Sequence, residues 1–304
     1  MRTRSLGLFT IVIVALLAPG TAGGQTQASG AGGGARTPWG DPDLHGIWTN
    51  TTTTPMQRPE DLKGREFLTD EERATRNPGS GLSTEVRSTY MPTGAYNDYW
   101  LEKGELSERT SLIVDPPNGR YPAMTPGAQQ RQQKMRAAFL GDGIDSWKDL
   151  RPYDRCITRG MPDAMSPGFY NHNSQILQTP DHVVILVEMI HDARIIPLEG
   201  RGQLSPSVKQ WLGYSRGRWE GDTLVIETTN LPEGERTVIE RLTRIDADTI
   251  DYRITVTDPA EWTGPWTALM PMTAFEGPVF EYACHEGNYA LPGRLGGARA
   301  DQTR

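Results

Sequence analysis

The stretch RGRWEGDTLVIETTN, residues 216–230, decides the fold because it has the pattern of a complete β-hairpin. Its second half contains Thr-Leu-Val-Ile, a run of residues that favours strands. Glu220-Gly221-Asp222 supplies the turn before it, and glycine there can adopt the positive φ that tight turns need. The pattern therefore predicts one strand over residues 212–219 and a second over residues 223–230.

A second hairpin is predicted upstream, between residues 170–178 and 183–192. The later segment is rich in Val, Ile and Leu, and the turn at 179–182 contains Pro and Asp. If Gln178 pairs with Val183 across this turn, His172 and His191 lie on one face of the sheet, ~7–8 Å apart as diagonal neighbours. A slip of one residue would separate the two imidazoles.

A third hairpin is predicted downstream, over residues 237–245 and 250–258. If the residues beside its turn pair directly, Arg241 and Tyr252 project inward among apolar side chains, while Glu240 lies on the solvent face. A cation in such an interior needs a carboxylate or an anionic ligand.

A last strand pair is predicted over residues 266–273 and 279–286. Sequential hairpins of this kind predict a mainly β fold, an antiparallel meander that closes into a lipocalin-like barrel, because open sheet edges invite aggregation. A β-sandwich is the alternative. Gly46-Ile47-Trp48 resembles the Gly-x-Trp that opens the first strand of lipocalin-type barrels, and the resemblance implies that Trp48 packs across the barrel floor.

The N-terminus has the pattern of an export signal. Arg2 and Arg4 precede an uncharged apolar run over residues 6–18, and small residues follow, so residues 1–22 are predicted to be a signal peptide. The apolar run is too short to span a bilayer, although an uncleaved N-terminal anchor is an alternative. Apart from Arg36, residues 23–36 are Gly, Ala, Ser, Gln and Thr with almost nothing to bury, which predicts a flexible tether.

The remaining chain divides into three parts. Residues 37–152 are Pro-rich and charged, which predicts an irregular, partly helical segment packed on the barrel. Within it, Thr69 has the capping-box pattern, and Thr125 before a proline marks a second helix start. Residues 153–293 are the predicted barrel core, and residues 294–304 form a C-terminal tail.

The composition is typical of a soluble globular protein and argues against several kinds of partner. The 304 residues are 36% hydrophobic and 23% charged, as in soluble globular chains. The net charge is −7 and no Lys/Arg cluster stands out, which argues against nucleic acid and anionic lipid as partners. Cys156 and Cys284 are the only cysteines, and an even count in an exported chain favours one disulfide, with two separately buried thiols as the alternative.

Four motifs together resemble a family of exported bacterial proteins of unassigned activity. They are YNHN (170–173), IHDAR (190–194), RGRWEGDTL (216–224) and CHEGNY (284–289). The resemblance implies a periplasmic or secreted location and carries no chemistry of its own.

Five residues are candidates for catalysis. His172, His191 and His285 can move protons near neutral pH, and Arg155 and Arg194 can hold a developing oxyanion with a planar guanidinium. The alternative for each histidine is a structural hydrogen bond, and for each arginine a surface ion pair.

A ligand site is also expected on the inner wall of the barrel. Tyr170, Arg241, Tyr252 and Trp219 are its candidate binding residues, because aromatic walls suit sugars and planar organic ligands. A metal site is disfavoured, since the close His-x-His spacing is missing. The sequence also lacks a Gly-x-Ser-x-Gly elbow, a P-loop and a dinucleotide fingerprint, so no cofactor is expected.

These observations favour an exported barrel protein that binds a small molecule without a cofactor and is not inserted in a membrane after its signal is cleaved. One alternative is a cofactor-free acid–base enzyme, a lyase, isomerase or hydratase, that uses histidines inside the barrel. The other is an envelope interaction protein with an exposed apolar patch.

Overall fold

The structure is a computed structural model that describes residues 34–76, 102, 104–139, 144–198, 202–232 and 234–302. The predicted signal peptide and all but the last three residues of the predicted tether lie outside these ranges. Among the described helices, none is long and apolar enough to cross a membrane.

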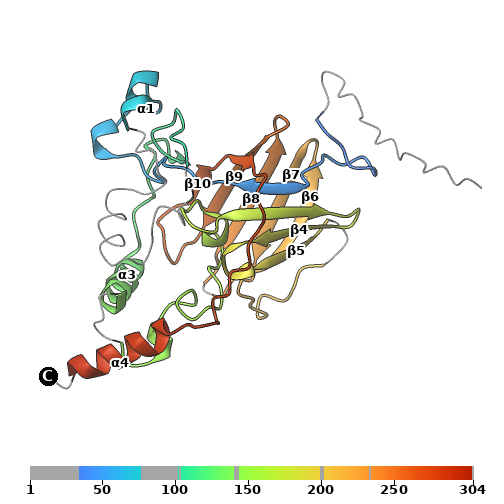
Figure 1. The fold of residues 1–304 in the computed structure, drawn as a ribbon. Coiled ribbons are helices and arrows are strands. Elements are labelled where there is room, and N and C mark those ends of the chain that lie inside the picture. The colour runs from blue at the N-terminus through green and yellow to red at the C-terminus, as the bar shows by residue number, and fades with distance from the viewer. Residues whose placement is uncertain are drawn as a thin grey trace, which may run out of the picture. The chain divides into compact units, whose positions relative to one another are not determined.

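The described chain is dominated by one antiparallel sheet of eleven strands (Figure 1). The strands are β1 Gly46–Thr49, β2 Ile113–Asp115, β3 Asn173–Gln178, β4 His182–Val187, β5 Ala193–Pro197, β6 Tyr214–Glu220, β7 Thr223–Thr229, β8 Thr237–Arg244, β9 Thr249–Thr257, β10 Trp266–Leu269 and β11 Met272–Ala274. Their order in the sheet is β5-β4-β3-β1-β11-β9-β8-β7-β6, and β10 joins β9 to β2. Two strands, β1 and β2, come from residues 37–152, the segment predicted to be irregular and partly helical, and β1 contains the Gly46-Ile47-Trp48 motif that was expected to open a strand.

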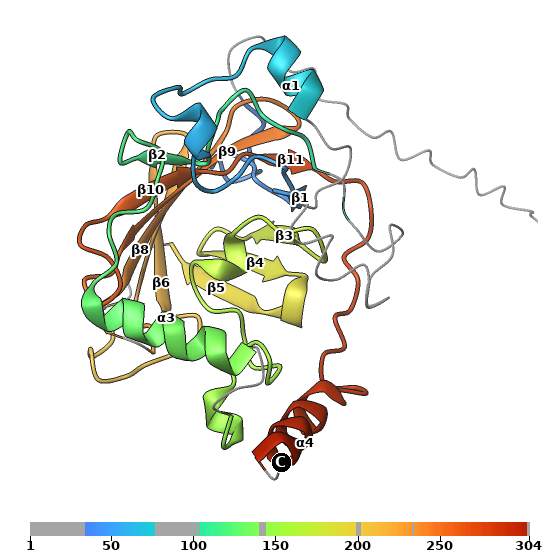
Figure 2. The same ribbon diagram turned by 90° about the vertical axis from the view of Figure 1, so that its left-hand side faces the viewer.

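The sheet is nearly closed into a barrel. Figure 2 shows β6 and β8 on one side and β3, β4 and β5 on the other, connected by β9, β11 and β1. The two ends of the strand order approach each other, since a Cβ added to Gly217 on β6 would lie 3.1 Å from Ile196 Cγ2 on β5. The predicted mainly β, antiparallel barrel architecture is therefore confirmed.

Large apolar side chains fill the interior of the barrel. Trp48, Ile176, Leu224 and Tyr252, from four different strands, are completely or almost completely buried. The Trp48 Nε1 donates a hydrogen bond to the Leu44 carbonyl at 3.0 Å, which satisfies the one polar atom of the ring. The expectation that Trp48 packs inside is confirmed, and the interior is a packed core.

The first hairpin has the predicted register but shorter strands. Gln178 lies opposite Val183, as expected. The pairing ends at Ser174 and Val187, however, before it reaches the two histidines. Ile190 and His191 then adopt positive φ values of 63° and 50°, which turn the chain out of the sheet. The prediction that His172 and His191 are diagonal neighbours on one face of the sheet is therefore wrong.

The third hairpin slips by one residue from the predicted register. Ile250 pairs with Arg244 instead of Ile245, so the inward and outward faces of β8 are exchanged. Glu240 is completely buried, whereas the Arg241 side chain is 43% exposed and pairs with Glu220 at 2.9 Å. The prediction of Arg241 as a buried cation is therefore wrong, and Arg194 is the buried cation instead.

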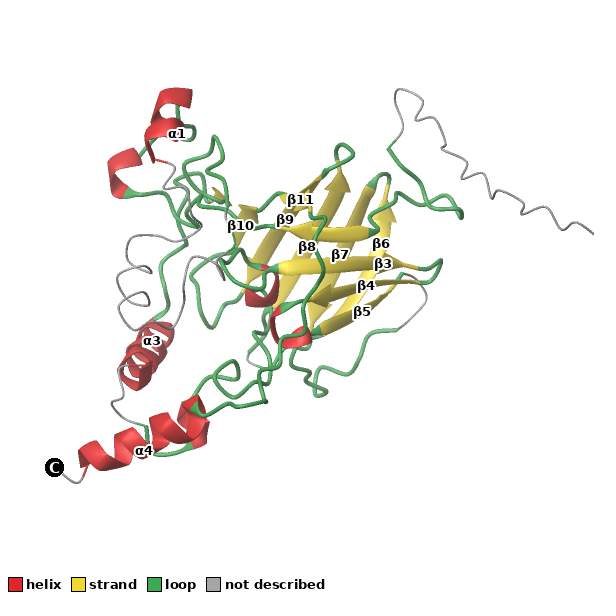
Figure 3. Ribbon diagram, viewed as in Figure 1, coloured by secondary structure: helices red, strands yellow, loops and turns green. Residues whose placement is uncertain are grey.

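The helices lie outside the sheet (Figure 3). They are the α-helices α1 Asp70–Arg76, α3 Pro126–Phe139 and α4 Ala290–Gln302 and the 3₁₀ helices η1 Glu60–Leu62, η3 Trp147–Asp149, η4 Asp163–Met165 and η5 Met189–His191. The predicted capping box is present, because Thr69 N donates to the Glu72 carboxylate and Glu72 N donates to Thr69 Oγ1. Thr125 caps α3 as expected through a bond from Ala128 N.

The predicted last strand over residues 279–286 does not form. The chain there is irregular, and the Phe280 backbone N–H donates to the Glu188 carboxylate at 2.8 Å, a side-chain partner in place of a strand partner. Side-chain contacts and a disulfide hold this segment, so the ladder pattern expected from its sequence is absent. The last strand of the described sheet is β11.

Candidate functional site

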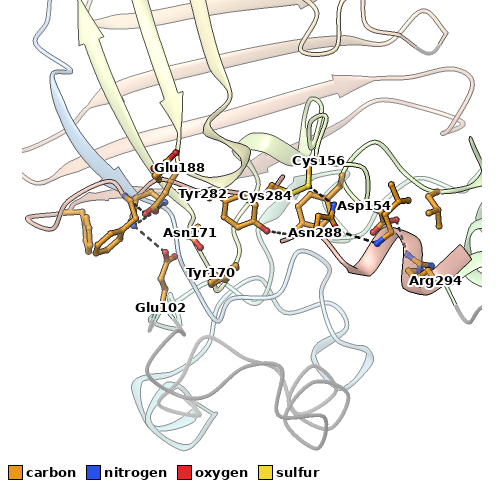
Figure 4. A pocket seen from close by; sticks show the side chains of 18 residues that line it. Glu102, Asp154, Cys156, Tyr170, Asn171, Glu188, Tyr282, Cys284, Asn288 and Arg294 are labelled. Atoms are coloured by element: carbon orange, nitrogen blue, oxygen red, sulfur yellow. Dashed lines mark hydrogen bonds and ion pairs between the residues drawn. A yellow bond between two sulfur atoms is a disulfide. The ribbon is translucent and has the colours of Figure 1, made fainter. Parts of the chain in front are cut away.

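A cleft of about 880 Å³ lies at the end of the barrel, where β3 begins and β4 ends. We call it the outer cleft, and its walls include Glu102, Tyr153, Tyr170, Glu188, Tyr282 and Arg294. Figure 4 shows the two glutamates at one end, Arg294 at the other, and tyrosines between them. The cleft is distinct from the packed interior in which a ligand was expected.

A disulfide holds one wall of the outer cleft in place. Cys156 and Cys284 are bonded, with their Cα atoms 5.6 Å apart, so the predicted pairing is confirmed. Asn288 Nδ2 donates to Cys156 Sγ at 3.1 Å and adds a second connection between the same two chain segments. Because both cysteines line the cleft, the disulfide fixes the position of Tyr282 relative to the barrel.

Glu188, directly after β4, is a carboxylate with 1% of its surface exposed. Asn173 donates to it from Nδ2 at 2.8 Å and from its backbone N–H at 3.3 Å, and Phe280 N donates at 2.8 Å. Glu188 therefore also attaches the chain after β11 to the barrel.

Glu102 lies near Glu188 because both carboxylates accept from Asn173 Nδ2, at 3.4 Å and 2.8 Å. Glu102 also accepts from Thr51 Oγ1 at 2.8 Å and from His172 N at 3.1 Å. Burial raises the pKa of Glu102, and the charge of Glu188 adds to the rise, while the two hydrogen bonds oppose it. Two acidic groups thus surround one amide at this end of the cleft.

Three tyrosines form the middle of the outer cleft. The rings of Tyr170 and Tyr282 are nearly perpendicular, with centroids 6.0 Å apart. The Tyr153 hydroxyl lies 3.4 Å from that of Tyr282. Burial raises the pKa of Tyr170, so its phenol stays uncharged at neutral pH. The tyrosines therefore present aromatic faces with polar rims.

The far end of the cleft carries a compensated pair of charges. Arg294 on α4 lies 3.4 Å from the Asp154 carboxylate and also donates to the Ala138 carbonyl at 2.8 Å. Within the described ranges, no basic side chain forms an ion pair with Glu102 or Glu188. The negative charge of the cleft is therefore concentrated at the glutamate end.

The three candidate histidines do not share the outer cleft. His172 is buried beside it, where Nε2 accepts from Arg159 at 2.9 Å; burial, together with the Arg159 charge, lowers its pKa to about 3. His191 is exposed, and its Nδ1 lies 3.1 Å from the Tyr282 carbonyl. His285 is exposed as well. The expected convergence of imidazoles in one pocket is wrong, because the strands that would have aligned them end too early or do not form.

Most of the other predicted site residues also lie elsewhere. Arg155 lies over the Trp147 ring at 5.2 Å, and Trp219 is half-buried against the core. Arg194 and Tyr252 are buried inside the barrel, both bonded to Glu240. Of the predicted ligand-binding residues, only Tyr170 lines the outer cleft, together with the two cysteines of the predicted disulfide.

The residues that define the cleft were missed from the sequence. Glu188 had a local signal, because it is the one charged residue in the apolar run VVILVEMI and therefore requires a partner. Glu102, Tyr153 and Tyr282 had none, since their positions depend on contacts between segments far apart in the chain.

Metal binding has no support in the described part of the chain, where no group of three or more His, Cys, Asp or Glu side chains is placed to hold an ion. A second cavity, of about 510 Å³, lies beside α3 and β10. Two of its acidic groups have basic partners, with Arg131 2.9 Å from Glu261 and Arg236 2.7 Å from Asp258, and a third, Asp163, lies in the field of Arg159 and Arg236. Of these two cavities, the outer cleft is the one whose glutamates have no basic ion-pair partner among the described residues.

Comparisons with known proteins gave no match, whether with protein-family models, with curated proteins or with solved structures. The resemblance to exported bacterial proteins stays a prediction from the four motifs. The geometry of the outer cleft therefore provides the support for a function.

Proposed function

We propose that this chain is an exported protein that binds a small molecule in the outer cleft. The observation that carries the proposal is the cleft itself, whose volume of about 880 Å³ falls within the ~300–1,000 Å³ of typical ligand sites. Its aromatic walls and its few convergent polar groups are also typical of such sites. Export is supported by the leader pattern and by the disulfide, which forms in oxidising compartments.

Binding is favoured over histidine-dependent catalysis because the imidazoles are wrongly placed for a shared reaction. His172 is neutral and already accepts a hydrogen bond from Arg159, and His191 and His285 lie on the surface. The two cleft carboxylates, buried Glu188 and half-buried Glu102, are held by hydrogen bonds from the protein. Preformed groups of this kind suit recognition of a ligand.

The proposal is tested by blocking the cleft and screening for ligands by thermal unfolding. Ala283 lines the cleft, so Ala283→Trp fills it, while Ala247→Trp introduces the same side chain into an exposed turn outside it. A ligand at one hundred times its Kd stabilises the folded chain by about 2.7 kcal/mol, which raises Tm by several degrees.

We expect compounds in a library of metabolites to raise Tm of the wild type and of Ala247→Trp but not of Ala283→Trp. If no compound stabilises the wild type, or if stabilisation survives in Ala283→Trp, the cleft is not the binding site. Export is tested separately by mass spectrometry of the mature N-terminus, which we expect to begin near residue 23.

A further inference from the structure

We propose that the ligand of the outer cleft is a small organic cation, an ammonium group with methyl or methylene substituents, held between the carboxylates of Glu102 and Glu188 and the rings of Tyr170 and Tyr282. This inference rests on the proposed function and specifies its ligand class.

The charges of Glu102 and Glu188 favour a cationic ligand. Glu188 is almost completely buried, and neither it nor Glu102 has a basic partner among the described residues. A buried carboxylate is costly unless a positive charge or strong hydrogen bonds compensate it. Arg294, which lines the opposite end of the cleft, already forms an ion pair with Asp154 and a hydrogen bond with a backbone carbonyl. The charge of a bound ligand can supply what the protein does not.

Both carboxylates already accept hydrogen bonds from the protein. Glu188 accepts three hydrogen bonds, and Glu102 accepts bonds from Thr51, His172 and Asn173. Neutral donors of this kind satisfy oxygen lone pairs but leave the net charge in place. A fully alkylated, quaternary ammonium compensates that charge without needing further hydrogen-bond acceptors, because it has no N–H group. A polyol, which is recognised mainly through hydrogen bonds, gains less from these groups.

The aromatic wall of the cleft also favours a cationic ligand. Tyr170 and Tyr282 meet nearly at right angles, with centroids 6.0 Å apart, so the two rings form a corner. The face of an aromatic ring attracts a cation, and such cages recognise substituted ammonium groups. Phe275 and Phe280 also line the cleft and offer apolar surface to methyl groups. A strongly hydrated metal ion would not benefit from these walls.

The decisive experiment compares two probes of the same shape by isothermal titration calorimetry. Choline carries a trimethylammonium group, and 3,3-dimethylbutan-1-ol is its neutral isostere. We expect choline to bind at least ~10-fold more tightly, since the two probes differ in charge and otherwise share their contacts.

Variants assign the preference to the cleft. Tyr170→Leu removes a ring face and is expected to weaken choline binding by ~10-fold, whereas Tyr170→Phe keeps the face and most of the affinity. Tyr289→Leu is the matched control, because Tyr289 is 81% exposed and is not part of the cleft wall. Glu102→Gln removes charge at nearly constant shape and is expected to reduce the preference for choline over its isostere by ~10-fold. Circular dichroism confirms that each variant is folded.

The outcomes separate the two proposals. Equal affinity for both probes, or a preference for choline unchanged by Tyr170→Leu and Glu102→Gln, overturns the cation class while the cleft stands as a binding site. The same holds if neither probe binds but neutral compounds from the library stabilise the wild type and not Ala283→Trp. If no compound of any class binds in the cleft, both proposals fail.

Discussion

Arg194 on β5 and Glu240 on β8 form an ion pair inside the barrel, where their side chains are 1% and 0% exposed. Arg194 Nη1 donates to Glu240 Oε1 at 2.9 Å, and the Tyr252 hydroxyl donates to the same oxygen at 2.9 Å. Arg194 also donates to Ser215 and Thr228. One guanidinium therefore links strands on both sides of the gap between β5 and β6.

Removing one partner of this pair is expected to be strongly destabilising. Glu240→Leu leaves the Arg194 charge buried without a counter-ion and should lower the free energy of unfolding by about 3–5 kcal/mol, as measured by urea denaturation. The double variant Arg194→Met/Glu240→Leu should recover most of the loss. The exposed pair Arg241–Glu220 is the control, and Glu220→Leu should change the urea midpoint little. Equal losses at the two pairs would contradict this account.

Stability should fall in mild acid because of His172. Its folded pKa of about 3 lies below the ordinary value of 6.5, owing to burial and to Arg159, while a hydrogen bond with the Ser166 backbone opposes the shift. Between these values the unfolded chain binds a proton that the folded chain excludes, so stability decreases as pH falls.

From pH 7 to pH 5, proton uptake by His172 in the unfolded chain lowers the free energy of unfolding by about 2 kcal/mol. The variant His172→Gln separates the contribution of His172 from that of Glu102, whose carboxylate accepts a hydrogen bond from the His172 backbone N–H. The variant should lose about 2 kcal/mol less than the wild type over this pH range in urea denaturation. Parallel losses in the two proteins would mean that His172 is protonated in the fold.

Gly168 is expected to tolerate no side chain, because a Cβ there would lie 1.8 Å from His172 Nε2. The imidazole is buried and bonded to Arg159, so it has no room to withdraw. Gly168→Ala should therefore cost about 1–3 kcal/mol through overpacking. Gly264→Ala, where no atom lies within 4 Å, is the control and should change the urea midpoint little. A stable Gly168→Ala protein would show that the imidazole is placed elsewhere.

The disulfide should matter for stability and for the cleft together. The double variant Cys156→Ala/Cys284→Ala is expected to lose about 2–5 kcal/mol, because the bond joins residues separated by 128 positions. It should also weaken ligand binding, since Cys284 holds the chain that carries Tyr282. Reductant should reproduce both effects in the wild type and have no effect on the double variant. Unchanged ligand affinity after reduction would show that the disulfide does not position the cleft wall.

The sequence predicts the fold where local patterns control it. The hairpin of β6 and β7 forms around Glu220-Gly221-Asp222, and the turn at 179–182 sets the pairing of Gln178 with Val183, because short turns fix register. The third hairpin was predicted one residue out of register because the residues beside its turn, Ile245 and Ile250, were paired directly, whereas Ile250 pairs with Arg244. The observed register turns Glu240 inward, where Arg194 is its partner. That partner lies 46 residues away in the chain.

The candidate site could not be predicted from local patterns. Glu102 and Glu188 both accept hydrogen bonds from Asn173, and the segment of Tyr282 is held near them by the disulfide and by the hydrogen bond from Phe280 to Glu188. Residues 279–286 have the composition of a strand, but their attachment by Glu188 and Cys284 replaces the expected ladder. Contacts between segments far apart in the sequence therefore determine the site, and pattern analysis of single segments does not contain them.

The position of a bound cation tests the central claim most directly. Tetramethylarsonium has the shape and charge of a quaternary ammonium, and its arsenic atom gives an anomalous X-ray signal that identifies its location in crystals of the protein. We predict one strong arsenic peak in the outer cleft, between the carboxylates of Glu102 and Glu188 and the rings of Tyr170 and Tyr282. A peak in the barrel interior or in the second cavity, or no peak at a saturating concentration, would contradict the account.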